Sequence, residues 1–131
     1  MALEFISPDG LINSPAYTHV VRATAGDTVY IAGQTPVDAD GNLVGGNDLE
    51  AQMRRAYANL ERALAAVGAT AANVAKTTTY VVNYTPEMRP IQHRVRSALF
   101  GDTPPANTLV GVQALAHPDF LFEVEAIAVL D

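Results

Sequence analysis

The sequence predicts a single α+β domain in which two helices pack on one face of a mixed sheet. Two stretches place apolar residues at helical spacing, and strand-like runs rich in β-branched residues lie before, between and after them. The expected order of elements is β-β-α-β-α-β-β. A chain of 131 residues has the size of one domain, so we assign residues 1–131 to one unit.

Two strands are expected to open the fold. Residues 16–24 and 28–32 are rich in β-branched and aromatic side chains. The pair Gly26-Asp27 between them is typical of a tight turn. We therefore predict that these two strands form a β-hairpin.

The first helix is expected to begin after Asn47, whose side chain can accept from the first-turn amides. Glu50, three residues on, would complete a capping box. Gly68 is placed to end the helix in the left-handed conformation. The apolar face of this helix consists of Leu49, Met53, Tyr57, Leu60, Leu64 and Val67.

The second half of the chain predicts a long strand at residues 74–83, then a helix, then two strands. Thr85 and Pro86 are suited to the helix start and Gly101 to its end. The apolar stripe of this helix consists of Met88, Ile91, Val95 and Leu99. The closing strands are expected near residues 106–113 and 120–129.

The last strand carries information about assembly. Alternate residues point to opposite faces of a sheet. One face of this strand holds Phe120, Phe122, Val124, Ala126 and Ala128, and the other holds Leu121, Glu123, Glu125, Ile127 and Val129. Apolar groups on both faces indicate that both are covered, and two helices cover only one. Self-association is the economical explanation.

Composition excludes several kinds of chemistry. The chain has no cysteine, which rules out disulfides, thiolate catalysis and zinc-thiolate sites and suits a cytoplasmic location. A net charge of −6 disfavours nucleic-acid binding. The sequence has no apolar run long enough to span a membrane, no phosphate-binding or dinucleotide motif, and no local metal motif among its three histidines. We expect no cofactor and no metal.

Five segments resemble the reactive intermediate deaminase family, RidA/YjgF. Residues 16–20 are similar to its Gly-Pro-Tyr-Ser-Gln, residues 31–37 to its Ile-Ser-Gly-Gln-Ile-Pro, and residues 74–81 to its Val-Lys-Thr-Thr-Val-Phe-Val. Residues 105–107 match Pro-Ala-Arg except at the last position, and residues 122–125 resemble its Ile-Glu-Ile-Glu. The resemblance extends over nearly the whole chain, from Tyr17 to Val129.

The resemblance implies a chorismate-mutase-like trimeric barrel with a ligand cleft between neighbouring subunits. Tyr17 and the main chain at Gly33 would line that cleft. Glu123 would position a water for attack on an imine carbon. The expected partners are therefore two further copies of the chain and a small molecule, with neither a nucleic acid nor a membrane.

Two positions depart from the family pattern. Ala32 replaces the family's serine, which removes a hydroxyl, and Asn107 replaces the arginine that grips the substrate carboxylate. An arginine offers a charged, two-pronged contact, whereas an asparagine offers neutral amide groups. We therefore expect weaker binding of 2-imino acids and an altered specificity.

Several side chains have two interpretations. His19 is a candidate for substrate binding because a strand would place it on the same side as Tyr17, or it is an ordinary strand residue. Glu123 is either catalytic or a structural carboxylate, and Glu125 is assigned to an interface or to solvent. Arg89, Arg94 and Arg96 are assigned to a solvated helix face, with the alternative that one of them supplies the missing cation.

The favoured function is that of an enamine or imine deaminase, a hydrolase that releases ammonia from a small unsaturated amino metabolite. The alternative is a non-catalytic trimer that binds a small metabolite. A ribonuclease is a third hypothesis, which the acidic charge opposes.

Overall fold

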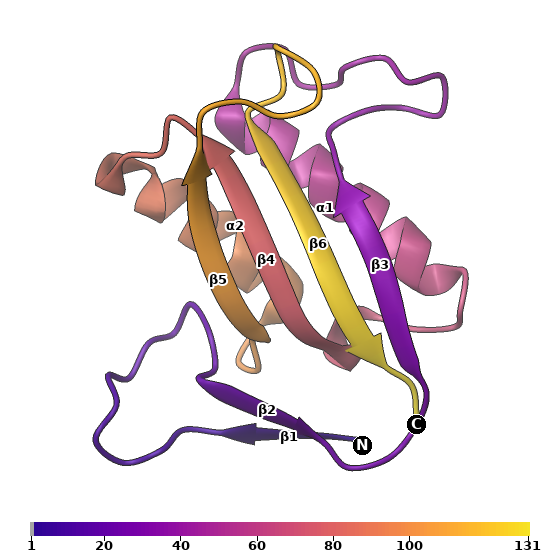
Figure 1. Cartoon of the computed structure of the whole chain (residues 1–131), viewed down its shortest axis with the longest axis vertical. Helices are drawn as coiled ribbons and strands as arrows, with labels where there is room; N and C mark the ends of the chain where they lie inside the picture. Colours follow the sequence, from indigo (N-terminus) through magenta and orange to yellow (C-terminus); the bar gives the residue numbers. More distant parts are fainter. Residues whose placement is uncertain (1) are drawn as a thin grey trace.

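The computed structural model describes residues 2–131, in which two helices lie behind a four-stranded sheet (Figure 1). The strands run in the order β3-β6-β4-β5. Strand β6 is antiparallel to both of its neighbours, whereas β4 and β5 are parallel, so the sheet is mixed as predicted. The strand bounds are β3, Thr28–Gln34; β4, Val74–Val82; β5, Ala106–Val112; and β6, Phe122–Val129.

Helices α1 (Leu49–Ala65) and α2 (Arg89–Phe100) cover the same face of this sheet (Figure 1). Two short 3-10 helices precede β4 and α2, at Ala71–Asn73 and Pro86–Met88. The core fills the space between the helices and the sheet. All five residues that were predicted to share one face of the last strand are buried: Phe120, Phe122, Val124, Ala126 and Ala128. The predicted alternation of this strand is confirmed.

The predicted opening hairpin is wrong. Strand β2 (Val20–Ala23) pairs with an additional strand, β1 (Leu3–Ile6), which was not predicted from the sequence. The two form a small sheet across one end of the main one (Figure 1). Strand β3 instead pairs with β6, because that pairing brings Val29 and Ile31 of β3 onto the helix-covered core.

Gly26 has a different role from a hairpin turn. A Cβ atom built on it would lie 1.5 Å from the carbonyl oxygen of Leu130, so only glycine lets the chain pass this close to the C-terminal backbone. Its φ of 97° also favours glycine. The amide of Leu130 donates to the carbonyl of Asp27 at 2.9 Å, which anchors the end of the chain beside the start of β3.

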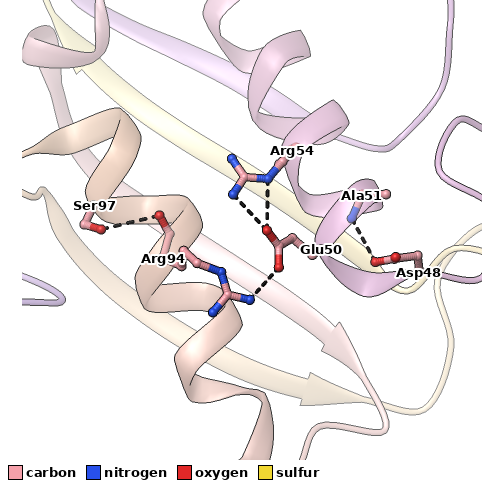
Figure 2. A network of polar contacts seen from close by, with 6 residues as sticks. All are labelled: Asp48, Glu50, Ala51, Arg54, Arg94 and Ser97. Carbon is pink, nitrogen blue, oxygen red and sulfur yellow. Dashed lines mark hydrogen bonds and ion pairs between the residues drawn. The ribbon is translucent and has the colours of Figure 1, made fainter.

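Helix α1 begins one residue later than predicted. Asp48, not Asn47, is the N-cap, and its Oδ1 accepts from the amide of Ala51 at 3.1 Å (Figure 2). Glu50 therefore does not form the capping box that was predicted for it. Its carboxylate pairs instead with Arg54 at 2.8 Å and with Arg94 of α2 at 2.5 Å, which ties the two helices together (Figure 2).

We predict that Glu50→Gln makes the free energy of unfolding less dependent on pH in the acidic range. Hydrogen bonds from Arg94 and Arg54 lower the pKa of Glu50 to about 2. A depressed pKa in the folded state stabilises it above the unfolded value of about 4.5, and that contribution disappears as the pH falls toward 2. The difference in urea midpoint between the parent and the variant should therefore be present at pH 7 and shrink below pH 4.5. Glu61→Gln, at an exposed residue of the same helix, is the control for removing one negative charge from α1.

The sheet face opposite the helices is open in a single chain. Its side chains include Tyr30, which is 78% exposed, and the Lys76 ammonium, which donates to Thr108 at 2.7 Å. This face also carries Tyr80, whose hydroxyl donates to the Glu125 carboxylate. Neither helix described within residues 2–131 combines the length and the apolar character needed to cross a membrane.

Candidate functional site

A groove of about 670 Å³ runs along the β5 edge of the molecule. One wall is the irregular segment of residues 12–17 and the other is helix α2. Asn107 and Leu109 of β5 lie at its base, with Tyr84 from the end of β4 beside them. The groove therefore brings together two residues predicted for the site, Tyr17 and Asn107.

The irregular wall is held by side chains next to it. Thr18 donates through its hydroxyl to the carbonyl of Pro104 at 2.6 Å, and His19 Nε2 donates to the carbonyl of Ile12 at 2.7 Å. The rings of Tyr17 and His19 meet edge to face, with centroids 5.0 Å apart. Residues 16–19 are not part of a strand, contrary to the expectation. His19 thus supports the wall behind Tyr17 and does not line the groove itself.

Asn107 is oriented by the neighbouring strand. It lies opposite Thr77 in the parallel pairing of β4 and β5, and its Oδ1 accepts from the buried Thr77 hydroxyl at 2.8 Å. This contact uses the acceptor of the amide and leaves Nδ2 to donate. The residue therefore presents a neutral donor to the groove, on the helix-covered side of the sheet.

Glu123 lies elsewhere, against Gly33. A Cβ atom at Gly33 would stand 1.8 Å from Glu123 Oε2, so the carboxylate occupies the space that any larger residue would fill. An irregularity in the pairing of β3 with β6, between Ile31 and Gln34, accompanies this contact. Ala32, the remaining predicted residue, is exposed in the same irregular stretch, and its carbonyl accepts from Gln34 Nε2 at 3.0 Å.

The surroundings of Glu123 favour its protonated form. Partial burial, and then the negative charge of Glu125 on the same face, raise the pKa of the Glu123 carboxyl. Glu125 is itself engaged by the Tyr80 hydroxyl, and that hydrogen bond raises the pKa of Tyr80. A carboxyl group with a raised pKa holds its proton to a higher pH than a freely solvated one, which is a property of acid-base groups in enzymes.

The sheet separates the two parts of the candidate site within one chain. Thr77, which bonds Asn107, is fully buried on the helix side. Glu123 and Tyr80 are paired across β6 and β4, on strand positions that alternate with the buried Val124 and Val81. Glu123 and Asn107 therefore face opposite sides of the sheet. Among residues 2–131, no three histidine, aspartate or glutamate side chains gather as a metal-binding group.

The assignment of the α2 arginines to a solvated face is wrong for Arg96. It is 4% exposed and lines the groove, whereas Arg94 is exposed and pairs with Glu50. Gln92, one turn earlier, is also buried and lines the groove. Gln92 and Arg96 are four residues apart, and the buried Phe100 follows at the same spacing. This four-residue spacing is the sequence signal that identifies the inward-facing side of α2.

The fold and the groove define the class of this protein: a small α+β domain with one helix-covered sheet face and one open face. Residues 11–130 match the family model described as "Endoribonuclease L-PSP". The chain belongs to this family, which is also called RidA/YjgF, and the predicted resemblance is confirmed.

Relatives and solved structures agree with this assignment. A RutC family protein of Pyrococcus abyssi is 32% identical over 112 residues, covering 86% of this chain and 84% of its own, and one of Saccharolobus solfataricus is 34% identical over 103 residues, covering 79% of each. Among solved structures, a Yersinia pestis protein of unknown function from the Rid family, YyfB, is similar with a TM-score of 0.94 and 42% identity, covering 99% of this chain and 100% of its own. A putative endoribonuclease of Thermotoga maritima has a TM-score of 0.72 and 29% identity, covering 95% of this chain and 92% of its own.

Proposed function

We propose that this protein is an enamine or imine deaminase that hydrolyses a small unsaturated amino metabolite and releases ammonia. The observation that carries the proposal is the carboxylate of Glu123, which lies against Gly33 with a raised pKa. The resemblance to the family assigns the same two positions to the reaction centre. The groove at Tyr17 and Asn107 is the complementary half of the site, where the substrate binds.

The proposed reaction needs one acid-base group. An enamine first takes up a proton on carbon and becomes its imine tautomer protonated on nitrogen, and water then adds to the carbon of the C=N bond while Glu123 accepts the water proton. The resulting carbinolamine carries a hydroxyl and an amino group on one carbon. Glu123 returns the proton to nitrogen, the C–N bond breaks and ammonia leaves, while the hydroxyl gives its proton to the Glu123 carboxylate and becomes the carbonyl. The raised pKa of Glu123 suits both transfers.

The proposal requires more than one copy of the chain. Because the sheet separates Glu123 from Asn107, a complete site has to combine Glu123 of one subunit with the groove of another. The open sheet face is the surface available for this contact, and the family resemblance implies a homotrimer. We therefore place the site between subunits of a trimer.

We predict that light scattering at micromolar concentration gives about 42 kDa, three times the 13.9 kDa of one chain. Tyr30→Lys should shift the mass toward that of the monomer, because it places a charge where an exposed aromatic ring is expected to be buried. Val67→Lys, at a hydrophobic residue that is exposed beyond the end of α1, is the control and should leave the mass unchanged. A stable monomer for the parent chain would contradict the assembly and with it the shared site.

Glu123→Gln tests the reaction. Ammonia release from 2-iminopropionate generated in the assay, and from small enamines, should fall by about 100-fold or more, as expected when an acid-base group is removed. Glu125→Gln should keep its activity, but the acidic limb of its rate profile should move to lower pH, because it removes a charge that raises the pKa of Glu123. An unchanged rate in Glu123→Gln would eliminate this mechanism.

The second candidate function is binding of a small metabolite without turnover. It is favoured by Asn107, which presents a neutral amide where the family resemblance places the charged carboxylate-binding residue. Tight binding with no ammonia release in the parent chain would support it. Several relatives are named endoribonucleases, so cleavage of single-stranded RNA belongs in the same assay set. The net charge of −6 opposes that activity.

A further inference from the structure

We propose that the groove binds a neutral imine or enamine that has no carboxylate and carries a carbonyl oxygen together with an aromatic or branched hydrocarbon group. The Asn107 amide binds the carbonyl oxygen, and the apolar lining of the groove binds the hydrocarbon group. The inference rests on the proposed function, because it takes the groove as the substrate-binding half of the site and names the class of substrate.

The first observation is the available donor of Asn107. Its Oδ1 accepts from the Thr77 hydroxyl at 2.8 Å, which fixes the orientation of the amide. The Nδ2 atom has no partner among residues 2–131, and it is not one of the unpartnered polar atoms that are shut off from solvent. Asn107 Nδ2 is therefore a neutral donor that a ligand in the groove can reach.

The second observation is that the buried cation beside the groove is directed away from it. Arg96 is 4% exposed, and its Nη1 donates to the Tyr57 hydroxyl at 2.8 Å. Its Cζ lies 5.1 Å from the centre of the Phe100 ring. Arg96 Nε and Nη2 are closed to solvent as well. A ligand in the groove therefore cannot form an ion pair with this guanidinium group.

The other basic groups of the groove lie on the exposed part of α2. Arg89 and His93 line the groove, and both are exposed. Water and salt screen such groups, so they attract an anion only weakly. A ligand carboxylate against Asn107 would lose its hydration in exchange for one neutral donor, whereas a carbonyl oxygen is satisfied by that donor. The groove therefore favours a neutral ligand.

The third observation is the size and lining of the groove. Its volume of about 670 Å³ lies in the range of pockets that enclose ligands larger than a three-carbon acid. The Tyr17 ring is held in place by the edge-to-face contact with His19, with centroids 5.0 Å apart. Apolar and aromatic side chains come from both sides of the groove and from its base: Ile12, Pro15, Ala16, Tyr17, Tyr84 and Leu109. This lining suits a ring or a branched hydrocarbon group placed beside the Asn107 donor.

Calorimetric titration of the assembled protein with methyl benzoylformate, benzoylformate and methyl pyruvate tests the substrate class. Each ligand has a stable ketone in place of the imine. Benzoylformate replaces the neutral ester with a carboxylate, and methyl pyruvate replaces the phenyl group with a methyl group. The parent protein should bind methyl benzoylformate about 10-fold or more tightly than either of the others. The carboxylate loses hydration without a buried cation in reach, and the methyl group buries less apolar surface.

Asn107→Asp tests the donor. The variant retains an oxygen that accepts from Thr77, but it replaces the amide donor with a negatively charged acceptor. Its affinity for methyl benzoylformate should fall by about 10-fold or more. Asn83→Asp is the matched control, because it adds the same charge at an exposed residue next to Tyr84 that does not line the groove, and it should keep the parent affinity.

Leu109→Ala tests the hydrocarbon subsite at the base of the groove. It should weaken the binding of methyl benzoylformate by several-fold and leave that of methyl pyruvate unchanged, because only the phenyl group reaches for this apolar contact. Equal losses for the two ligands would overturn the placement of the hydrocarbon group.

Benzoylformate binding as tightly as its methyl ester would overturn the neutral ligand, and methyl pyruvate binding as tightly as methyl benzoylformate would overturn the hydrocarbon group. An undiminished affinity in Asn107→Asp, or no binding of any of the three ligands by the parent, would also overturn the proposal. If Asn107→Asp does not assemble, the side-chain amide resonance of Asn107 in the parent replaces it: a shift with methyl benzoylformate supports the contact, and no shift refutes it. None of these ligands has a C=N bond, so absence of deaminase activity leaves the test intact and bears only on the proposed function.

Discussion

Gly33→Ala is expected to reduce the proposed imine hydrolysis by about 100-fold or more without unfolding the protein. The new methyl group would lie 1.8 Å from Glu123 Oε2 and 2.8 Å from its Cδ, so the carboxylate has to leave its position. Gly33 is exposed and its φ is not positive, so alanine fits the backbone itself. The initial rate of ammonia release, together with the assembled mass, measures the effect.

A double-mutant cycle tests whether Gly33→Ala acts through the Glu123 carboxylate. If alanine acts by displacing the Glu123 carboxylate, Gly33→Ala should lower the residual rate of Glu123→Gln only slightly. If the rate losses of the two single variants multiply in the double variant, Gly33 contributes through its own main chain. An unchanged rate for Gly33→Ala alone would mean that the Glu123 position seen here is not the reactive one.

Gln52→Leu is expected to cost about 3–5 kcal/mol of folding stability, a large share of the roughly 5–15 kcal/mol typical of a domain. Gln52 is fully buried on α1. Its Nε2 donates to the carbonyls of Gly46 at 2.7 Å and Asp119 at 3.0 Å, and its Oε1 accepts from the amide of Leu121 at 2.7 Å. Leucine would leave these three backbone groups without their partner.

Gln92→Leu is the matched control for Gln52→Leu. Both are glutamines buried on a helix, but Gln92 Nε2 has no partner among residues 2–131. Replacing it should change stability by less than about 1 kcal/mol, or raise it, because a poorly satisfied polar group is removed. Urea unfolding at one protein concentration compares the two, since assembly makes stability depend on concentration. Similar losses would show that volume, not hydrogen bonding, dominates at position 52.

Local patterns were sufficient for most of the elements and for one half of the site. The spacing of Leu49 through Leu64 predicted α1, and the alternation of Phe122, Val124 and Ala126 predicted that these residues share one face of β6. The motifs around Gly33 and Glu123 pointed to two residues that the structure places in contact. These features follow from the periods of helices and strands, which neighbouring residues determine.

Other features depended on residues far apart in the chain. Gly26 looked like a hairpin turn, but its lack of a side chain serves the close approach of Leu130, more than a hundred residues away. Strand β2 consequently pairs with β1, and β3 with β6. Turn chemistry shows where a chain can reverse, whereas the partner of a strand depends on which pairing buries its apolar face.

The sequence alone determined the family, the two helices, the main strands and the faces they bury, because each is encoded by short-range spacing and by contiguous motifs. The tertiary structure decided the environment of the charged groups. Arg96 is a long polar side chain on a helix, and only Tyr57 and Phe100 packing around it show that its head group is buried. The sheet likewise places Glu123 and Asn107 on opposite faces. Burial and charge contacts arise from elements distant in the sequence, so no local pattern records them.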